Sequence, residues 1–464
     1  MSYDYDVIII GAGMSGLAAG IRLAYFEKKV LILDRHYAIG GLNSLYRLKG
    51  YSFDVGLHAM TNYVPKGSKG TPLIKLLKQL RFTYEDFDLC PQTFSTIQFP
   101  QKTLRFSNDF EFLRQEIAQG FPHQIDAFNR FVDYCLSYNE VSLTAQPLSS
   151  LTLLQSYFSD PLLIDMLLLP LMYYGSAVEG DMEFGQFVIM FKSIFCEGFA
   201  RPQTGVRQIL ILLNKKYKEC GGAIRMSCGV DRLLVENQRV TGVQLETGEV
   251  LTAEKILSSA GYPETMKLCS NISASEPSQN PTPGVMTFME TISVLDCDAK
   301  KDLGHETTII FFNRTEQFRY QRAKDLIDVN SGVICCPNNF QLKKPLPHSL
   351  IRITNIANFD LWDALNEDEY LEQKEKCYQA SMAKVTELIP DFRSHIIFQD
   401  IFTPKTIKKF TGHLNGAVYG CPEKRKDGTT YLKNLFLCGT DQGFLGIIGA
   451  MLSGISMANL HTLK

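Results

Sequence analysis

The chain has 464 residues, of which 45% are hydrophobic and 21% charged, a composition typical of a folded protein with two or three domains. Its 47 basic and 49 acidic residues give a net charge of −2, which implies neither a nucleic-acid partner nor a strongly acidic one. Because no run of about 18 apolar residues occurs, a membrane-spanning helix is not expected.

The twelve cysteines are scattered, with no CxxC pair and no Cys/His spacing typical of a metal site. We therefore expect free thiols in a reducing compartment and no metal ion. The first predicted strand begins at Val7, which leaves no room for a signal peptide. The predicted location is the cytoplasm, and peripheral contact with the cytoplasmic face of a membrane stays open.

The first 34 residues carry the most specific motif of the chain. An apolar run, Val7–Ile10, predicts a buried parallel strand that leads into Gly11-x-Gly13-x-x-Gly16, a helix, and a second apolar strand ending in Asp34. Gly11 permits the tight turn, Gly13 lets the backbone approach a pyrophosphate, and Gly16 lets the helix lie close to the sheet. The helix N-terminus favours phosphate, and Asp34 is placed to bind ribose hydroxyls. The unit predicts a dinucleotide-binding domain.

A second pair of glycines, Gly40-Gly41, follows within the segment from Ile39 to Ser44. Such a pair lets the backbone pass close to a ligand beyond the first glycine motif. A longer cofactor needs backbone that stays close to it beyond the pyrophosphate, so the pair favours a flavin over a nicotinamide. The next segment contains Phe53-Asp54-Val55-Gly56, which predicts a short strand that ends in a turn.

Residues 81–204 lose the alternation of strands and helices, and their Phe, Leu and Tyr residues at helical spacing predict mostly helices. The most apolar stretch, Pro161–Gly175, is interrupted by Asp165 and Pro170. It predicts either a buried or kinked pair of helices in a core, or the wall of an apolar cavity, or a patch that dips into a membrane surface.

From residue 205 the α/β pattern returns and, after a polar Pro- and Ser-rich linker at 270–284, continues to the C-terminus. The predicted strands are Ala223–Met226, Val230–Glu236, Val240–Leu245, Lys255–Ser259, Val285–Leu295, Thr307–Phe312, Leu350–Ile356 and Leu435–Cys438. The predicted helices are Val206–Cys220, Glu367–Ile389 and a C-terminal helix of small residues that follows a glycine-rich turn.

These patterns predict an α/β fold that is discontinuous in sequence. A Rossmann-type FAD-binding domain with three layers, ββα, would comprise residues 1–80, 205–270 and 425–464. An inserted α+β substrate-binding domain would comprise residues 81–204 and 271–424, and its helical part could face a membrane.

The motifs resemble those of the flavin-dependent superfamily of carotenoid desaturases, carotenoid isomerases and retinol saturases, which is related to the flavin amine oxidases. The resemblance covers nearly the whole chain, with its specific motifs at the two ends. Phe53–His58 and the NGAVYG segment, Asn415–Gly420, are similar to segments of retinol saturases, and the C-terminal GTDQGFLGIIGAM also looks more like a saturase.

The resemblance implies FAD as the cofactor. The residues it places at the FAD site are Gly11, Gly13, Met14, Ser15, Gly16, Asp34, Arg35, Gly40, Gly41, Leu42, Asn43, Val230, Gly439, Asp441 and Gly449. Leu42 stands where many relatives carry an arginine, so the contacts of that arginine do not carry over.

The motifs that the sequence lacks narrow the range of possible reactions. Only one GxGxxG motif occurs, and no redox CxxC pair, metal set or Ser/His/Asp set is evident. What remains is hydride transfer at the flavin, or flavin-assisted rearrangement of a double bond. The favoured function is an FAD-dependent oxidoreductase that desaturates, saturates or isomerises C–C or C=C bonds of a long hydrophobic isoprenoid or polyene lipid, such as a carotenoid or retinoid. An external quinone, oxygen or reductant would exchange the electrons. A flavin amine oxidase and a non-catalytic FAD-binding lipid carrier are the alternatives.

His58 and Tyr419 are the catalytic candidates. His58 follows the predicted FDVG turn and could donate a hydrogen bond or a proton beside the flavin. Tyr419 could form half of an aromatic pair facing the flavin, as an amine oxidase would require, and His413 is a further candidate nearby. Asp441 lies at a strand-to-helix turn, where its carboxylate or the adjacent N–H groups are expected to meet the ribityl chain or the pyrophosphate.

Overall fold

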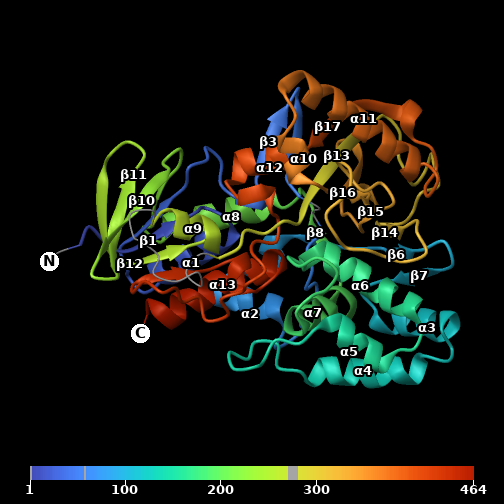
Figure 1. Ribbon diagram of the computed structural model, residues 1–464, viewed down its shortest axis with the longest axis horizontal. Helices are drawn as coiled ribbons and strands as arrows, with labels where there is room; N and C mark the ends of the chain where they lie inside the picture. The colour runs from blue at the N-terminus through green and yellow to red at the C-terminus, as the bar shows by residue number, and fades with distance from the viewer. Residues whose placement is uncertain (1–2, 57–58, 270–280, 464) are drawn as a thin grey trace.

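Two large sheets, each with its own covering layers, divide the protein into two halves (Figure 1). The computed structural model describes residues 3–56, 59–269 and 281–463. His58 and most of the predicted linker at 270–284 therefore lie outside the described residues.

The first sheet is the one predicted from the N-terminal motif. Strands β9, β2, β1, β12 and β18 lie side by side in this order and run parallel. The beginning of β12 pairs antiparallel with β11, which pairs antiparallel with β10, so these three strands form a ribbon. The strands are β1 (Tyr5–Ile10), β2 (Val30–Leu33), β9 (Ala223–Arg225), β10 (Val230–Glu236), β11 (Arg239–Leu245), β12 (Val250–Ser258) and β18 (Leu435–Leu437).

The alternation of side chains along β1 produces the layers around this sheet. Val7 and Ile9 pack against helices, whereas Ile8 and Ile10 pack against the ribbon. The helices on the first side are α1 (Met14–Ala24), α2 (Pro72–Leu80), α8 (Arg207–Glu219) and α13 (Gly446–His461), and α9 (Tyr262–Lys267) lies on the ribbon side. The predicted Rossmann-type fold with ββα layers is confirmed.

The second sheet combines strands from both inserted segments, in the order β17, β13, β16, β15, β14, β6 and β7. Its strands are β6 (Ser95–Gln98), β7 (Thr103–Phe106), β13 (Thr287–Leu295), β14 (Ile309–Asn313), β15 (Ser331–Cys335), β16 (Ser349–Ala357) and β17 (Ile396–Phe402). The short strands β5 (Leu89–Pro91) and β8 (Ala200–Pro202) pair separately. The prediction that residues 81–204 are mostly helical therefore missed four strands.

The missed strands are short, and their partners are remote. β6 is four residues long and pairs in parallel with β14, so that Ser95 lies opposite Ile309. A pattern this short carries little local signal, because its stability comes from the sheet that it joins. The helical part of the prediction is right for α3 (Phe110–Gly120), α4 (Ile125–Ser137), α5 (Ser150–Tyr157), α6 (Pro161–Gly175) and α7 (Phe184–Phe191).

These five helices cover one face of the second sheet, and α10 (Phe359–Asp363) and α11 (Glu367–Val385) cover the other. The hairpin β3 (Leu45–Leu48) and β4 (Tyr51–Asp54) and the helix α12 (Pro404–Thr411) lie where the two halves meet, as Figure 1 shows. The strands of each sheet fall within the predicted segments, and the assignment of the two halves to cofactor and substrate stays a prediction.

Helix α6 settles the alternatives for the apolar stretch at 161–175. It is one helix rather than a pair, with Pro170 inside it, and it is buried from Met166 to Gly175. A buried helix cannot face a membrane, so that interpretation of this stretch is wrong. Tyr174 near its end lines a cavity, as the cavity-wall alternative expected.

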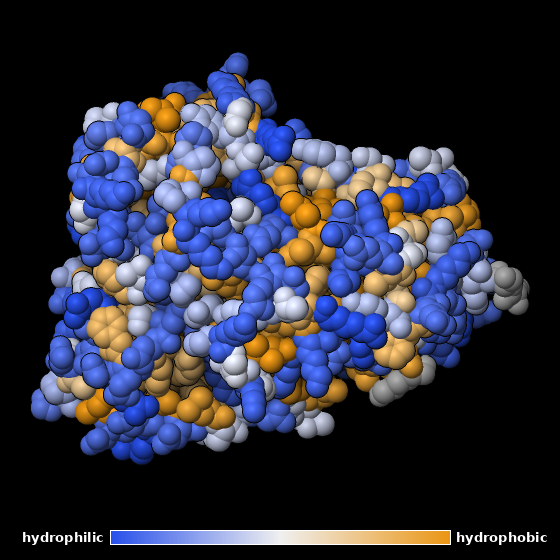
Figure 2. Space-filling model, turned by 180° about the vertical axis from the view of Figure 1, so that it is seen from behind, coloured by the Kyte–Doolittle hydropathy of each residue, from blue (hydrophilic) through white to orange (hydrophobic). Residues whose placement is uncertain are grey.

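Among the described residues, no helix is both long and apolar enough to cross a membrane. Figure 2 shows a mostly hydrophilic surface on the face seen from behind, with hydrophobic side chains in small groups, several of them near the middle of the molecule.

Candidate functional site

A cleft of about 320 Å³ lies at the C-terminal ends of the parallel strands β1, β2, β12 and β18. Ligands bind at this edge of parallel sheets, because the turns there lead into helix N-termini. Of the predicted cofactor residues, those that line the cleft are Gly11, Gly13, Met14, Ser15, Asp34, Arg35, Gly40, Gly41, Leu42, Asn43, Val230, Gly439 and Asp441. Gly16 and Gly449 do not line it, although Ala450, next to Gly449, does. The contacts of these residues with a cofactor stay a prediction.

The first glycine motif uses its glycines in two different ways. A Cβ atom on Gly16 would lie 2.0 Å from the carbonyl oxygen of Gly11, so Gly16 is required for the close packing of α1 on the turn. A Cβ atom on Gly13 would meet only the carbonyl oxygen of Gly40, at 3.9 Å. Since nothing in the protein crowds Gly13, the absence of a side chain there keeps open the space above the start of α1. That is the space in which a pyrophosphate would lie.

Asp34 supports the turn and still has room for a ligand. Its Oδ2 accepts a hydrogen bond from the N–H of Ala12 at 2.7 Å, and its Oδ1 accepts one from the N–H of His36 at 2.8 Å. An ionised carboxylate offers about four acceptor positions. Two therefore remain for the ribose hydroxyls that the sequence analysis expected.

The Asp441 carboxylate is occupied by the protein itself. It accepts hydrogen bonds from the N–H groups of Tyr262 at 2.6 Å and Cys421 at 2.9 Å, and Lys424 Nζ lies 3.3 Å from Oδ1. Both Asp441 and Lys424 are buried. Asp441 therefore ties the segment after Tyr419 and the start of α9 to the glycine-rich turn after β18. The contact of this turn with a ligand, through the carboxylate or the adjacent N–H groups, stays a prediction.

A half-buried pair that no motif marked lies in the same cleft. His413 Nδ1 is 3.6 Å from Glu264 Oε1, which also accepts the N–H of Leu414 at 2.7 Å. Burial lowers the pKa of His413, but the Glu264 carboxylate and then Asp441 raise it, and the net direction is upward. The sequence analysis named His413 as a further candidate near the flavin, and it did not mark Glu264 as a lining residue.

A second cavity, of about 370 Å³, adjoins the first. The residues that line both are Gly41, Leu42, Asn43, Thr411, Thr440 and Ala450. The second cavity extends from there to the face of the second sheet and to Tyr174 of α6. Its lining is largely apolar and aromatic, with Phe288, Phe402, Val418, Leu445 and Ile447 among its residues. A group bound across the junction would be exposed to both cavities.

Tyr419 lines the second cavity, but its hydroxyl is engaged. It donates a hydrogen bond to the carbonyl oxygen of Tyr173, and its ring packs edge-on against Phe288, with ring centroids 5.9 Å apart. Burial raises the pKa of this hydroxyl. The arrangement suits Tyr419 to a role as an apolar wall better than to proton transfer, and its catalytic role stays a prediction.

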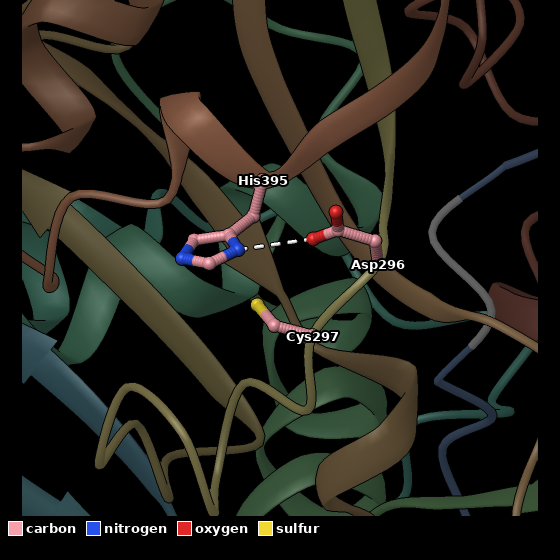
Figure 3. Close-up of side chains that lie close together, drawn as sticks. All are labelled: Asp296, Cys297 and His395. Carbon is pink, nitrogen blue, oxygen red and sulfur yellow. Dashed lines mark hydrogen bonds and ion pairs between the residues drawn. The ribbon is translucent and has the colours of Figure 1, made fainter.

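Away from both cavities, Asp296, Cys297 and His395 lie close together, from the end of β13 and the turn before β17 (Figure 3). Within the described part of the chain they are the one group of three such side chains close enough to hold a metal ion, with ligand atoms within 4.8 Å of one another. The hydrogen bond between His395 Nδ1 and Asp296 Oδ1, at 3.0 Å, explains their proximity without an ion. Asp296 is exposed to solvent.

Residues 9–80 match the family described as "NAD(P)-binding Rossmann-like domain". Over 98% of its length the chain is 22% identical to prolycopene isomerase 2 of an Oncidium hybrid and to all-trans-retinol 13,14-reductase of Danio rerio, covering 83% and 86% of these proteins. It is 24% identical to 4,4'-diaponeurosporene oxygenase of Staphylococcus aureus, with 93% of each chain covered. The predicted resemblance to carotenoid- and retinol-modifying enzymes is confirmed.

Solved structures share the fold. An oxidoreductase from Methanosarcina mazei superimposes with a TM-score of 0.69 at 17% identity, covering 98% of this chain and 99% of the other. Putrescine oxidase superimposes with a TM-score of 0.65 at 15% identity, covering 98% of each chain. The dinucleotide-binding, Rossmann-like character of the first half is therefore supported by both sequence and structure.

Proposed function

We propose that the chain is an FAD-dependent oxidoreductase that desaturates, saturates or isomerises carbon–carbon bonds of a long hydrophobic isoprenoid or polyene lipid. The observation that carries this proposal is the junction of two cavities, one built like a dinucleotide site and the other lined by apolar side chains. A flavin held in the first would present its ring system to a lipid held in the second.

The residues of the first cleft fit FAD. The open space at Gly13, the remaining acceptor positions of Asp34 and the N-terminus of α1 suit the pyrophosphate and a ribose. The second glycine pair continues the side-chain-free surface, since a Cβ on Gly41 would lie 3.8 Å from Gly13 Cα. FAD bound there would supply hydride transfer at its N5 atom. The protein would hold it, exclude water and orient the lipid beside it.

The apolar lining of the second cavity suits a substrate with few polar groups. Reaction at unactivated carbon depends on orientation beside the flavin more than on strong acids or bases. The relatives named for prolycopene, retinol and diaponeurosporene support a polyene, because all three names describe conjugated lipids. The electron partner would be a quinone, oxygen or a transient reductant, and the lipid would enter from a membrane surface.

The test begins with the cofactor and lipid that the purified protein carries. We expect FAD to be released on denaturation and a polyene or isoprenoid to be found by mass spectrometry of an organic extract. Anaerobic addition of that lipid should oxidise the reduced flavin or reduce the oxidised one, or should isomerise the lipid with no net flavin change. Absence of bound flavin would contradict the proposal. So would a flavin that a diamine such as putrescine reduces while no polyene affects it, the result expected of an amine oxidase.

A further inference from the structure

A row of three side chains crosses the floor of the second, largely apolar cavity. Glu290 of β13 lies opposite Thr354 of β16 on one side and opposite Phe402 of β17 on the other. Residues directly opposite each other on neighbouring strands point to the same face of a sheet. All three line the second cavity, and neither Glu290 nor Thr354 lines the first cleft, at the ends of the parallel strands. An acid and a hydroxyl are thus neighbours in a lining that is largely apolar.

The Glu290 carboxylate is anchored through one of its two oxygens. Arg352 Nε donates to Oε1 at 2.6 Å, and Arg352 Nη2 forms an ion pair with the same atom. Arg352 is held in turn by the carbonyl oxygen of Asp54, which accepts from Nη1 at 3.1 Å. Within the described part of the chain, no hydrogen bond reaches Oε2 of Glu290. The second oxygen is therefore available to a group in the cavity.

Two residues that line the cavity also carry a hydroxyl without a partner. Thr354 Oγ1 and Tyr174 Oη are buried and make no hydrogen bond with any residue that the structure describes. Buried polar groups nearly always have a hydrogen-bond partner in folded proteins. An unpaired hydroxyl next to a carboxylate with one free oxygen, in a largely apolar cavity, suits a ligand that supplies the missing partner.

The chemistry of the row favours a neutral group that both donates and accepts. Arg352 compensates the charge of Glu290, so the pair attracts an ammonium group less than a lone carboxylate would. Burial raises the pKa of Glu290, Arg352 lowers it, and the nearby Asp400 carboxylate raises it further, with a net upward direction. A hydroxyl matches Glu290 in either protonation state, since it donates to the carboxylate or accepts from the acid, and it can bond Thr354 as well.

We propose that Glu290 and Thr354 form a polar subsite that binds a hydroxyl group of the lipid, so that the substrate is a polyene or isoprenoid alcohol rather than a hydrocarbon. This inference rests on the proposed function and names the substrate class of the same cavity. Glu290 and Thr354 are specificity residues, and Arg352 positions Glu290. The subsite would fix how far the chain enters and which bond lies beside the flavin.

The test compares matched polyenes on the FAD-loaded protein. All-trans-retinol, its analogue with a methyl group in place of CH2OH, and retinylamine are titrated, and binding is followed through the absorbance and fluorescence of the polyene. One hydrogen bond to a charged group corresponds to about tenfold in affinity, so the wild type should prefer the alcohol over the hydrocarbon by about tenfold. Thr354→Val and Glu290→Gln should each reduce this preference at least about threefold.

Thr291→Val is the matched control. Thr291 is next to Glu290 on β13 and its hydroxyl is likewise buried and unpaired among the described residues, but it does not line the cavity. This variant should leave the preference unchanged. Thermal unfolding and FAD content check that each variant is folded, and Thr354→Val keeps the test valid if Glu290→Gln is unstable.

The outcomes separate the two proposals. If alcohol and hydrocarbon bind the wild type equally, or if the preference survives in both variants, the subsite is refuted while the lipid function stands. Tighter binding of retinylamine than of retinol would also refute it and would indicate a cationic ligand. If the FAD-loaded protein binds none of the polyenes, the proposed function fails, and this inference with it.

Discussion

The two glycines Gly13 and Gly16, three positions apart, should respond to the same substitution in opposite ways. In Gly16→Ala the new methyl group would lie 2.0 Å from the Gly11 carbonyl oxygen, far inside van der Waals contact. Because that atom is backbone, α1 or the turn must shift. Overpacking of this kind costs about 1–3 kcal/mol of unfolding free energy.

In Gly13→Ala the methyl group meets nothing nearer than the Gly40 carbonyl oxygen at 3.9 Å, and Gly13 has φ −75° and ψ −177°, which alanine adopts freely. The apoprotein should therefore lose less than about 1 kcal/mol, the usual difference between residues at a helix N-cap. The methyl group would instead occupy the space for the pyrophosphate. A steric cost of about 1–3 kcal/mol paid only on binding weakens FAD affinity by about tenfold to a hundredfold.

The assay measures both quantities on each variant. Denaturant unfolding of the apoprotein followed by circular dichroism gives the stability, and quenching of flavin fluorescence on titration gives the FAD affinity. The reasoning is refuted if Gly13→Ala binds FAD as tightly as the wild type. It is also refuted if Gly16→Ala unfolds at the wild-type denaturant concentration, since the close contact would then carry no cost.

Three further predictions concern buried polar groups. Asp441→Asn removes the charge that pairs with buried Lys424 and should cost about 3 kcal/mol in urea unfolding; a change below about 1 kcal/mol would contradict the assigned role. Tyr419→Phe removes the hydrogen bond to Tyr173, so we expect stability to fall by about 1 kcal/mol and turnover to fall by less than about tenfold. A fall in turnover of about a hundredfold would instead establish proton transfer by this hydroxyl. Burial lowers the pKa of His305 to about 4 from 6.5. The protein should therefore keep its full stability above pH 6.5 and lose about 3 kcal/mol as the pH falls towards 4, because the unfolded chain binds the proton more tightly. His305→Leu should flatten the stability–pH curve in this range, and an unchanged slope would contradict this reasoning.

Much of the first half of the fold could be predicted from the sequence, because its signals are local. The strand β10 has the bounds expected for it, and β2 ends at Leu33, directly before Asp34. Gly11 is required by the turn, with φ +103°, and Gly16 by its contact with that turn, so sequence spacing and spatial arrangement agree. Such a motif can be interpreted before the fold is known.

The second half was predicted less completely, because its strands are joined across long separations. The strands β6 and β7 become part of a sheet only when β14 lies beside them, and neither segment carries this information alone. The same holds for Glu290 and Thr354, which are 64 positions apart (354 − 290) and become neighbours only through the pairing of β13 with β16. An isolated glutamate in an apolar strand carries no such signal.

The sequence by itself determined the dinucleotide-binding unit, its flavin-like extension and the resemblance to lipid-modifying flavoenzymes, since these depend on residues close together in the chain. Only the tertiary structure decided which side chains line the second cavity and which of their polar atoms are free. It showed that the Asp441 carboxylate and the Tyr419 hydroxyl form hydrogen bonds within the protein. It also showed that Glu290 and Thr354 lie side by side in the lining of a largely apolar cavity. The physical reason is that whether a polar atom finds a hydrogen-bond partner depends on which strands and turns lie side by side, and only the folded chain brings remote segments together.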